Sequence, residues 1–177
     1  MRKPLIVRWR SKLTPLAREV HRRILRTIFK MDVGVGAHIS LSARLDKTNP
    51  QGIHIGEYTA VTFDAAILTH DFVNRVHRDV YIGKYCFIGA RSLIYPGVTI
   101  GDHCIVSAAT VVMKDVPSNC VVAGNPGRVV ETGIQTGPLG YRIKVPLAIR
   151  SGSRPDVAEG VQEAAAVEEA ESERRDA

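Results

Sequence analysis

Cysteine is scarce in this chain, and its spacing excludes two common kinds of small domain. The 177 residues contain only Cys86, Cys104 and Cys120, with wide gaps and no C-x-x-C pair. A disulfide framework or a zinc knuckle needs paired, closely spaced cysteines. The sequence therefore argues against both and fits a reducing compartment.

Long apolar runs are also missing. Near the N-terminus the longest run is Pro4 to Val7, which is too short for a secretory signal or a spanning helix. We therefore expect a cytoplasmic protein. The chain is long enough for one well-buried domain with an appendage at each end.

Acidic residues are nearly absent from the first part of the chain. Residues 1–30 hold ten Lys or Arg and one acid, whereas residues 151–177 hold eight acids and three Arg. The net charge of +6 therefore comes from one terminal segment and not from the main domain. Aromatic residues do not alternate regularly with the basic ones, so we expect no nucleic-acid partner.

What is present is a repeat of six residues. An aliphatic residue recurs at every sixth position in three registers across residues 33–130, and a small residue often follows it four positions later. The registers are Val33, Ile39 and Leu45; Ile55, Val61 and Ile67; and Ile82, Ile88, Ile94, Ile100, Val106 and Val112. This pattern predicts a solenoid in which each hexad makes one short strand and a turn.

Three hexads per coil would give a triangular prism of parallel strands. The aliphatic side chain points inward and stacks on its counterpart one coil away, and the small residue lies near a corner. Glycine after the aliphatic residue, as at Gly83, Gly89 and Gly101, suits a bend that other residues enter only with strain.

Two interruptions break the spacing. The step from Leu45 to Ile55 is ten residues and the step from Ile67 to Ile82 is fifteen, so about four and about nine residues are inserted. A solenoid accommodates insertions only at its corners, as loops, and such loops carry function. The second insertion opens with His70, in ILTHDFVNRVHRDVYIG, and this is where we expect the chemistry.

The stretch IGARSLIYPGVTIGDHCIVSAATVVMKDVPSNCVVAGNPGRVV is similar, nearly position by position, to hexapeptide-repeat acyltransferases. Within that family it resembles sugar O-acetyltransferases of the maltose, galactoside and polysaccharide-modifying type. The resemblance covers residues 33–131 and implies a left-handed parallel β-helix, although the usual crossover rule would predict the opposite hand. It also implies a homotrimer that uses acetyl-CoA as acyl donor.

The resemblance implies a role for each insertion. His70 would be the general base, a task that suits an imidazole because it titrates near neutral pH. The alternative is a loop histidine that only forms a hydrogen bond. Asp46 and Asn49 would contact the substrate, although their stretch LDKTNPQG is also ordinary turn sequence. Asp71 would either orient His70 or bind substrate.

Two further histidines have open roles. His54 either lines the groove of a neighbouring subunit or is an ordinary surface residue, and His77 either touches the acceptor or is solvated. A zinc enzyme with the same prism needs two histidines five residues apart, a spacing absent from this chain. We therefore expect no metal.

The donor site that the family implies lies on the regular coils, between adjacent prisms of a trimer. Ala90 and Ala108 match small positions along the pantetheine arm, and Met113 and Lys114 match a Thr-Lys pair. Lys114 would lie near the CoA phosphates, and Arg128 matches a CoA-contacting arginine. Met113 lacks the hydroxyl of threonine, so only its backbone suits this role. The alternative for all five residues is ordinary prism packing.

The stretch LTPLAREVHRRILRTIFK predicts an amphipathic helix with Thr14 as N-cap and Pro15 at its first position. The predicted apolar stripe comprises Leu13, Leu16, Val20, Ile24 and Ile28. It either packs on the prism or a neighbouring subunit, or it rests on an anionic membrane surface. In the second case the protein would be peripheral to the inner membrane or would contact polysaccharide-assembly proteins.

We therefore expect an all-β fold with a helical appendage. Its parts are a basic helical segment (1–32), a β-helix domain (33–131), a C-terminal extension (132–150) and an acidic, disordered tail (151–177). The predicted function is acetyl transfer from acetyl-CoA to a hydroxyl of a sugar or polysaccharide precursor. N-acetylation of a nucleotide-linked amino sugar and a non-catalytic scaffold remain alternatives.

Overall fold

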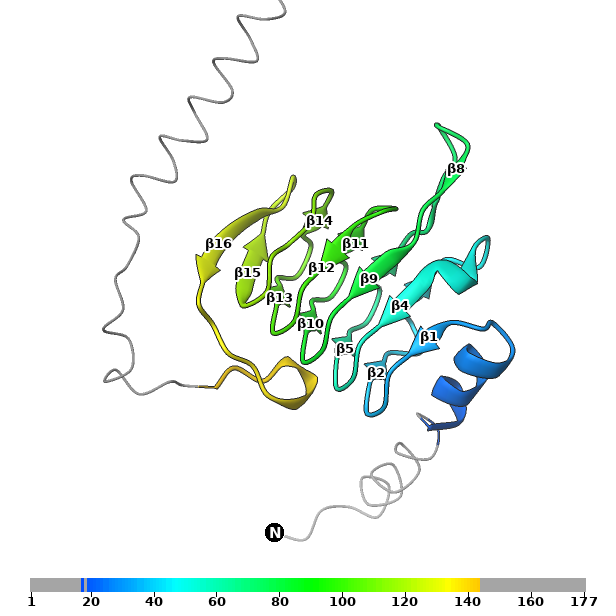
Figure 1. The fold of residues 1–177 in the computed structure, drawn as a ribbon, viewed down its shortest axis with the longest axis horizontal. Helices are drawn as coiled ribbons and strands as arrows, with labels where there is room; N and C mark the ends of the chain where they lie inside the picture. Colours follow the sequence, from blue (N-terminus) through cyan, green and yellow to red (C-terminus); the bar gives the residue numbers. More distant parts are fainter. Residues whose placement is uncertain (1–16, 18, 144–177) are drawn as a thin grey trace, which may run out of the picture. The chain divides into compact units, whose positions relative to one another are not determined.

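The computed structural model describes residues 17 and 19–143, which form a short helix over residues 19–27 and a coiled stack of short strands (Figure 1). The predicted acidic tail, residues 144–150 of the predicted extension and the predicted helix start at Thr14 and Pro15 lie outside the described residues. The prediction of a mostly β chain with an N-terminal helix is confirmed.

Three sheets form the faces of the stack. The first contains β1 (Asp32–Val33), β4 (Ile53–Ile55), β9 (Val80–Ile82) and β12 (Thr99–Ile100). The second contains β2 (His38–Ile39), β5 (Ala60–Val61), β10 (Phe87–Ile88), β13 (Ile105–Val106), β15 (Cys120–Ala123) and β16 (Arg128–Thr132). The third contains β3 (Arg44–Leu45), β6 (Ala66–Ile67), β11 (Leu93–Ile94) and β14 (Val111–Val112).

Strand pairing is parallel throughout these sheets except between β15 and β16, which are antiparallel. A separate two-stranded hairpin consists of β7 (His70–Asp71) and β8 (Val76–His77). Two single 3₁₀ turns complete the described elements, namely η1 (Pro50–Gly52) and η2 (Pro138–Gly140). Consecutive strands thus visit the three sheets in turn, as the hexads predict.

The aliphatic residues of the hexads stack in register. Val33 pairs with Ile55, Ile55 with Ile82, and Ile82 with Ile100, at sequence steps of 22, 27 and 18 residues. A regular coil therefore has 18 residues, and the two interruptions add four and nine. Both the three-register pattern and the size of the two insertions are confirmed.

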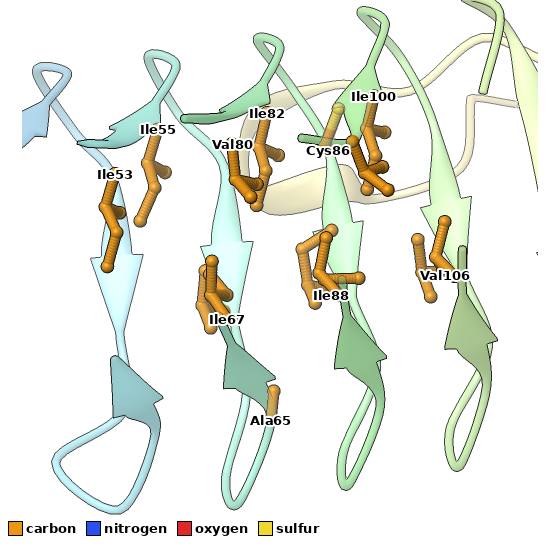
Figure 2. Close-up of a cluster of buried hydrophobic side chains, with 14 of the residues drawn as sticks. Ile53, Ile55, Ala65, Ile67, Val80, Ile82, Cys86, Ile88, Ile100 and Val106 are labelled. Carbon is orange, nitrogen blue, oxygen red and sulfur yellow. The ribbon is translucent and has the colours of Figure 1, made fainter. Parts of the chain in front are cut away.

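The core is a ladder of these side chains. Figure 2 shows Ile55, Ile82 and Ile100 in line across successive coils, and they are only 1–3% exposed. Burial of each such side chain stabilises the fold by about 1.5–3 kcal/mol relative to exposure. Cys86 and Cys104, four residues after Ile82 and Ile100, are also buried and are free thiols, so they are packing residues of the core.

Glycine follows the aliphatic residues for a reason different from the one that we predicted. Neither Gly56 nor Gly83 adopts a positive φ; the bends are instead made by residues such as Tyr58 and Tyr85, with φ of 52° and 55°. A Cβ atom at Gly83 would lie 2.7 Å from the backbone nitrogen of Asp102 in the next coil. Glycine is therefore required by the close approach of successive coils and not by the turn.

The chain after β16 folds back along one corner of the stack. Tyr58, Tyr85 and His103 stack there on successive coils, with ring centroids 5.6 and 5.2 Å apart. The Thr136 hydroxyl donates a 2.5 Å hydrogen bond to the Tyr85 carbonyl, and the Leu139 N–H donates one of 2.6 Å to the Tyr58 carbonyl. The described part of the C-terminal extension is thus bound to the prism.

The N-terminal helix packs on the prism through Leu25 and not through Val20, Ile24 and Ile28, the described residues of the predicted stripe. Leu25 is 5% exposed, and Arg22 Nη1 donates a hydrogen bond of 3.3 Å to the carbonyl of Gly34. Met31, also buried, donates its N–H to the carbonyl of Leu25 and leads directly into β1. This short connection decides which side of the helix meets the prism, and it leaves Val20, Ile24 and Ile28 exposed. The other two residues of the predicted stripe, Leu13 and Leu16, lie outside the described residues.

Candidate active site

The two insertions lie at the same corner of the prism, in consecutive coils. The first follows β3 and the second follows β6, the next strand of the same sheet. The hydroxyl of Thr69 donates a 2.7 Å hydrogen bond to the carbonyl of Asn49, so the loops touch. The two insertions are therefore neighbours in space.

At this contact His70 meets Asp46. The distance from His70 Nδ1 to Asp46 Oδ2 is 2.5 Å, with side-chain exposures of 30% for His70 and 3% for Asp46. An ionised carboxylate only accepts hydrogen bonds, so Nδ1 keeps its proton and donates a hydrogen bond to Asp46. In the neutral ring Nε2 is then left with a lone pair, which is the state that a general base needs.

Asp46 is held in its ionised form by several donors. Its carboxylate accepts hydrogen bonds from the backbone N–H groups of Thr48 at 2.8 Å and of Thr69 and His70 at 3.0 Å each. Burial by itself would raise the pKa of Asp46, but the bonds from the His70 side chain and from Thr69 and Thr48 outweigh it and hold the pKa well below its usual range.

Asp46 therefore differs from the substrate contact that we predicted. Its side chain is buried and its oxygens are occupied by protein donors, with the His70 ring among them. The sequence places Asp46 and His70 24 residues apart, and they become neighbours because Leu45 pairs with Ile67 in the next coil. Their pairing was missed because nothing in the hexad pattern predicts the direction of a loop side chain.

The second insertion forms the hairpin β7–β8, which projects from the stack (Figure 1). Asp71 closes its turn by accepting hydrogen bonds from Asn74, at 3.0 Å from the backbone nitrogen and 2.5 Å from the side-chain nitrogen. The structure thus gives Asp71 a structural partner in place of His70. His77 lies directly opposite His70 in the hairpin and is exposed, so the two residues share one face.

Asn49 contributes its backbone to this corner, through the carbonyl that Thr69 contacts. It precedes η1 as its N-cap residue but forms no side-chain capping hydrogen bond. Its side-chain nitrogen lies beside Gly52, where an added Cβ would come within 2.5 Å. The half-buried Asn49 is thus a packing residue of the first loop as well as a candidate contact.

The five predicted donor-site residues lie on the later coils, apart from the His70–Asp46 pair. Ala90 and Ala108 occupy successive coils at the corner between the second and third sheets, where the Ala109 N–H donates to the Ala90 carbonyl at 2.8 Å. Met113 and Lys114 directly follow β14 and are exposed. They therefore lie at the corner of the insertions, two coils beyond His70.

Arg128 begins β16 and is exposed, with a 3.2 Å hydrogen bond from Nη1 to the carbonyl of Gly127. Its guanidinium retains donors for a ligand. Among residues 19–143, no group of three or more His, Cys, Asp or Glu residues is placed to hold a metal ion.

His54, whose role the sequence left open, contacts three side chains of its own sheet face. Its ring stacks on Tyr81 with centroids 4.3 Å apart, and it lies between Asp32 at 3.4 Å and Asp79 at 3.6 Å. His54 and Tyr81 occupy equivalent positions in β4 and β9, so the register of the flanking aliphatic residues could have predicted this stack.

Comparison with known proteins identifies the family of this chain. The model of the bacterial transferase hexapeptide (six repeats) matches residues 79–114. The chain is 36% identical over 118 residues to "Putative acetyltransferase SAR0816" of Staphylococcus aureus, an alignment that covers 66% of this chain and 73% of that protein. It belongs to the hexapeptide-repeat acetyltransferase family.

This membership confirms the resemblance found in the sequence. Another member, "Putative acetyltransferase YvoF" of Bacillus subtilis, is 39% identical over 111 residues, which are 62% of this chain and 64% of that protein. A crystal structure of a maltose O-acetyltransferase from Clostridium difficile superposes with a TM-score of 0.52 at 28% identity. That superposition covers 73% of this chain and 89% of the maltose enzyme.

Proposed function

We propose that this protein transfers an acetyl group from acetyl-CoA to a hydroxyl of a sugar or polysaccharide precursor. The single observation that carries the proposal is the short hydrogen bond between His70 and the buried carboxylate of Asp46 at the opened corner. The acetyltransferase names of its relatives and the superposition on a maltose O-acetyltransferase support the choice of reaction and acceptor.

The reaction starts with the acceptor hydroxyl next to His70 Nε2. The imidazole takes the hydroxyl proton as the oxygen attacks the thioester carbonyl, and the new C–O bond forms. The C–S bond then breaks, and the leaving CoA sulfur takes the proton back from Nε2. The acetyl group thus passes directly to the acceptor oxygen and the proton to the CoA sulfur, without a covalent enzyme intermediate. This agrees with the burial of all three cysteines.

Asp46 acts in this scheme as a positioning residue. When His70 holds the acceptor proton it is an imidazolium, and the carboxylate 2.5 Å from Nδ1 stabilises that charge. The same bond fixes the ring so that Nε2 carries the lone pair in the neutral state. The predicted contact between Asp46 and substrate is thus replaced by a contact to the base, while Asn49 and Asp71 remain candidates for the acceptor site.

We further propose the donor site and the assembly that the family resemblance implies. The pantetheine arm would pass Ala90, Ala108 and the backbone of Met113, with Lys114 and Arg128 near the CoA phosphates. The coil would wind left-handed, and three copies would form the donor groove between them.

The decisive experiment replaces the base. His70→Ala should lower the rate of acetyl transfer by roughly 10²–10⁴-fold, because a general base contributes about that factor. Steady-state transfer from acetyl-CoA to a panel of plain and amino sugars measures it. His21→Ala, on the N-terminal helix, is the matched control and should retain the full rate.

Three outcomes would count against the proposal. Full activity of His70→Ala toward every active acceptor would remove the base from the mechanism. Transfer to amino sugars alone would replace the hydroxyl acceptor by an amine. An unchanged unfolding temperature in millimolar acetyl-CoA would favour a non-catalytic scaffold, since a ligand of the folded state must stabilise it.

A further inference from the structure

The N-terminal helix has apolar side chains on two sides, and the prism covers only one of them. Leu25 is buried, whereas Val20, Ile24 and Ile28 are 50%, 37% and 69% exposed. These three follow one another at steps of four residues and so form a row along one face of the helix. We call Val20, Ile24 and Ile28 the outer row.

The outer row stays exposed while a neighbouring side of the helix is held on the prism. Leu25, about 100° around the helix from Ile24, packs into the core, and Arg22 ties the helix to the carbonyl of Gly34. Ile28 lies just after the last helical residue, but its N–H still donates to the carbonyl of Ile24 at 2.9 Å, so the row continues through it. The apolar exposure therefore follows from the packing and not from a loose end.

Positive charge borders the outer row. Arg23 and Arg26 are exposed and line one hollow of the surface with Glu19, Arg22 and Thr27. The carboxylate of Glu19 is occupied by Arg22, with an Nη2–Oε2 distance of 2.6 Å. Arg23, three residues after Val20 and next to Ile24 in the chain, thus remains as a cation beside the row, and Arg26 adds a second exposed cation on the far side of the same helix. The preceding sequence adds more, since residues 1–12 contain five Lys or Arg, one Trp and no acid.

We propose that this face binds the surface of an anionic lipid bilayer. A helix with an apolar row and flanking arginines lies in the plane of a membrane interface, with its apolar side chains among the acyl chains and its cations at the headgroups. Each arginine near such a surface contributes on the order of 1 kcal/mol, and anionic lipid is therefore the favoured partner.

A second copy of the chain fits this face less well. Three partly exposed side chains offer only a small fraction of the roughly 800 Å² per partner that a stable protein interface buries. Like charges at Arg23 and Arg26 would also repel in a contact between two identical helices. Among the described residues no helix is long and apolar enough to cross a membrane, so the contact would be peripheral.

The test is sedimentation of the full chain with vesicles of phosphatidylcholine alone and of phosphatidylcholine with phosphatidylglycerol. We expect binding to the anionic vesicles that weakens as salt is raised, and little binding to the neutral ones. The triple variant V20S/I24S/I28S should bind anionic vesicles at least tenfold more weakly. The variant R23E/R26E should lose the preference for anionic lipid.

Matched controls distinguish binding through the outer row from non-specific hydrophobic binding to vesicles. V129S/V130S removes two exposed apolar side chains of β16, 43% and 61% exposed, and should leave vesicle binding unchanged. Circular dichroism and light scattering on every variant report fold and oligomeric state. Both should match the parent chain, because the outer row is not part of the core.

Each remaining outcome overturns the proposal. Absent binding of the parent chain, equal binding to both vesicle types, or undiminished binding of V20S/I24S/I28S would show that the outer row binds no anionic bilayer. A smaller oligomer formed by the triple variant, without vesicle binding by the parent, would make the row a contact between copies. None of these results depends on acetyl transfer, so the proposed function is tested separately.

Discussion

The interrupted coils between β3 and β9 and the regular coils between β9 and β14 are built on the same core but differ at one corner. Ile67 in the interrupted part and Ile94 in the regular part pair side by side, and both are fully buried. At the corner that follows, the regular coil turns at once toward β12. The interrupted coil instead leaves as a hairpin, whose first residue His70 contacts the buried Asp46 of the preceding coil.

This difference shows how a repetitive scaffold accommodates a polar site. The insertions add backbone outside the prism and leave the inward ladder in register. A buried carboxylate is expensive unless it accepts hydrogen bonds, and the loop supplies three backbone N–H donors for it. Stability and chemistry therefore lie in separate parts of the coil, and the two can be tested independently.

The largest expected effect is on stability, in the regular part. Ile88 lies in the core and is 0% exposed to solvent. Ile88→Ala should therefore lower the free energy of unfolding by about 2–5 kcal/mol. Urea denaturation measures this. Leu41→Ala, at a 75% exposed position, is the control and should change stability by less than about 0.5 kcal/mol. Equal losses would mean that the ladder is not the source of stability.

A smaller effect, on the rate of acetyl transfer, is expected in the interrupted part. Asp46→Asn keeps the size of the side chain but removes the charge that stabilises a protonated His70, so the transfer rate should fall by roughly 10²-fold, about 2.7 kcal/mol in the barrier. The initial rate as a function of pH is the measurement.

Asp64→Asn provides the matched control at a corner without an insertion. Asp64 lies at a turn with φ of 56°, which asparagine tolerates. Among residues 19–143 its carboxylate contacts only Arg91, at 3.9 Å. It should keep the parent rate and pH profile. A rate loss shared by both variants would argue that Asp46 has no special relation to the base.

The smallest effect concerns the tight corners. Gly83→Ala should cost about 1–3 kcal/mol of stability, because its Cβ would overlap the backbone of the next coil at Asp102 and successive coils would have to separate. Gly137→Ala meets only ordinary contacts at 3.7–3.8 Å and should be tolerated. The unfolding temperatures of the two variants measure the difference. If Gly83→Ala left the unfolding temperature unchanged, close approach of the coils would not be the reason for glycine at this position.

The site was only partly predictable from the sequence. His70 was found because it opens a break in an otherwise regular spacing. The partners of Asp46 and Asp71 were not found, since each depends on how a loop of irregular backbone folds: Asp46 turns inward to His70, and Asp71 closes the hairpin turn with Asn74. Hexad spacing carries no information about such side-chain directions.

The N-terminal helix shows the same limit. Its periodicity predicted an amphipathic segment, and the helix is present, but residues three and four apart define two possible apolar faces. The four residues that join the helix to β1 decide between them by bringing Leu25 onto the core and leaving Val20 and Ile24 outside.

Spacing alone determined the coil, its 18-residue period, the column of each aliphatic residue and the position of both insertions, because a strand side chain that must be buried can occupy only one phase of the repeat. Tertiary structure decided which loop residues meet and which helix face is covered. Those contacts join residues of different coils through backbone that has no period, and they exist only once the coils have stacked.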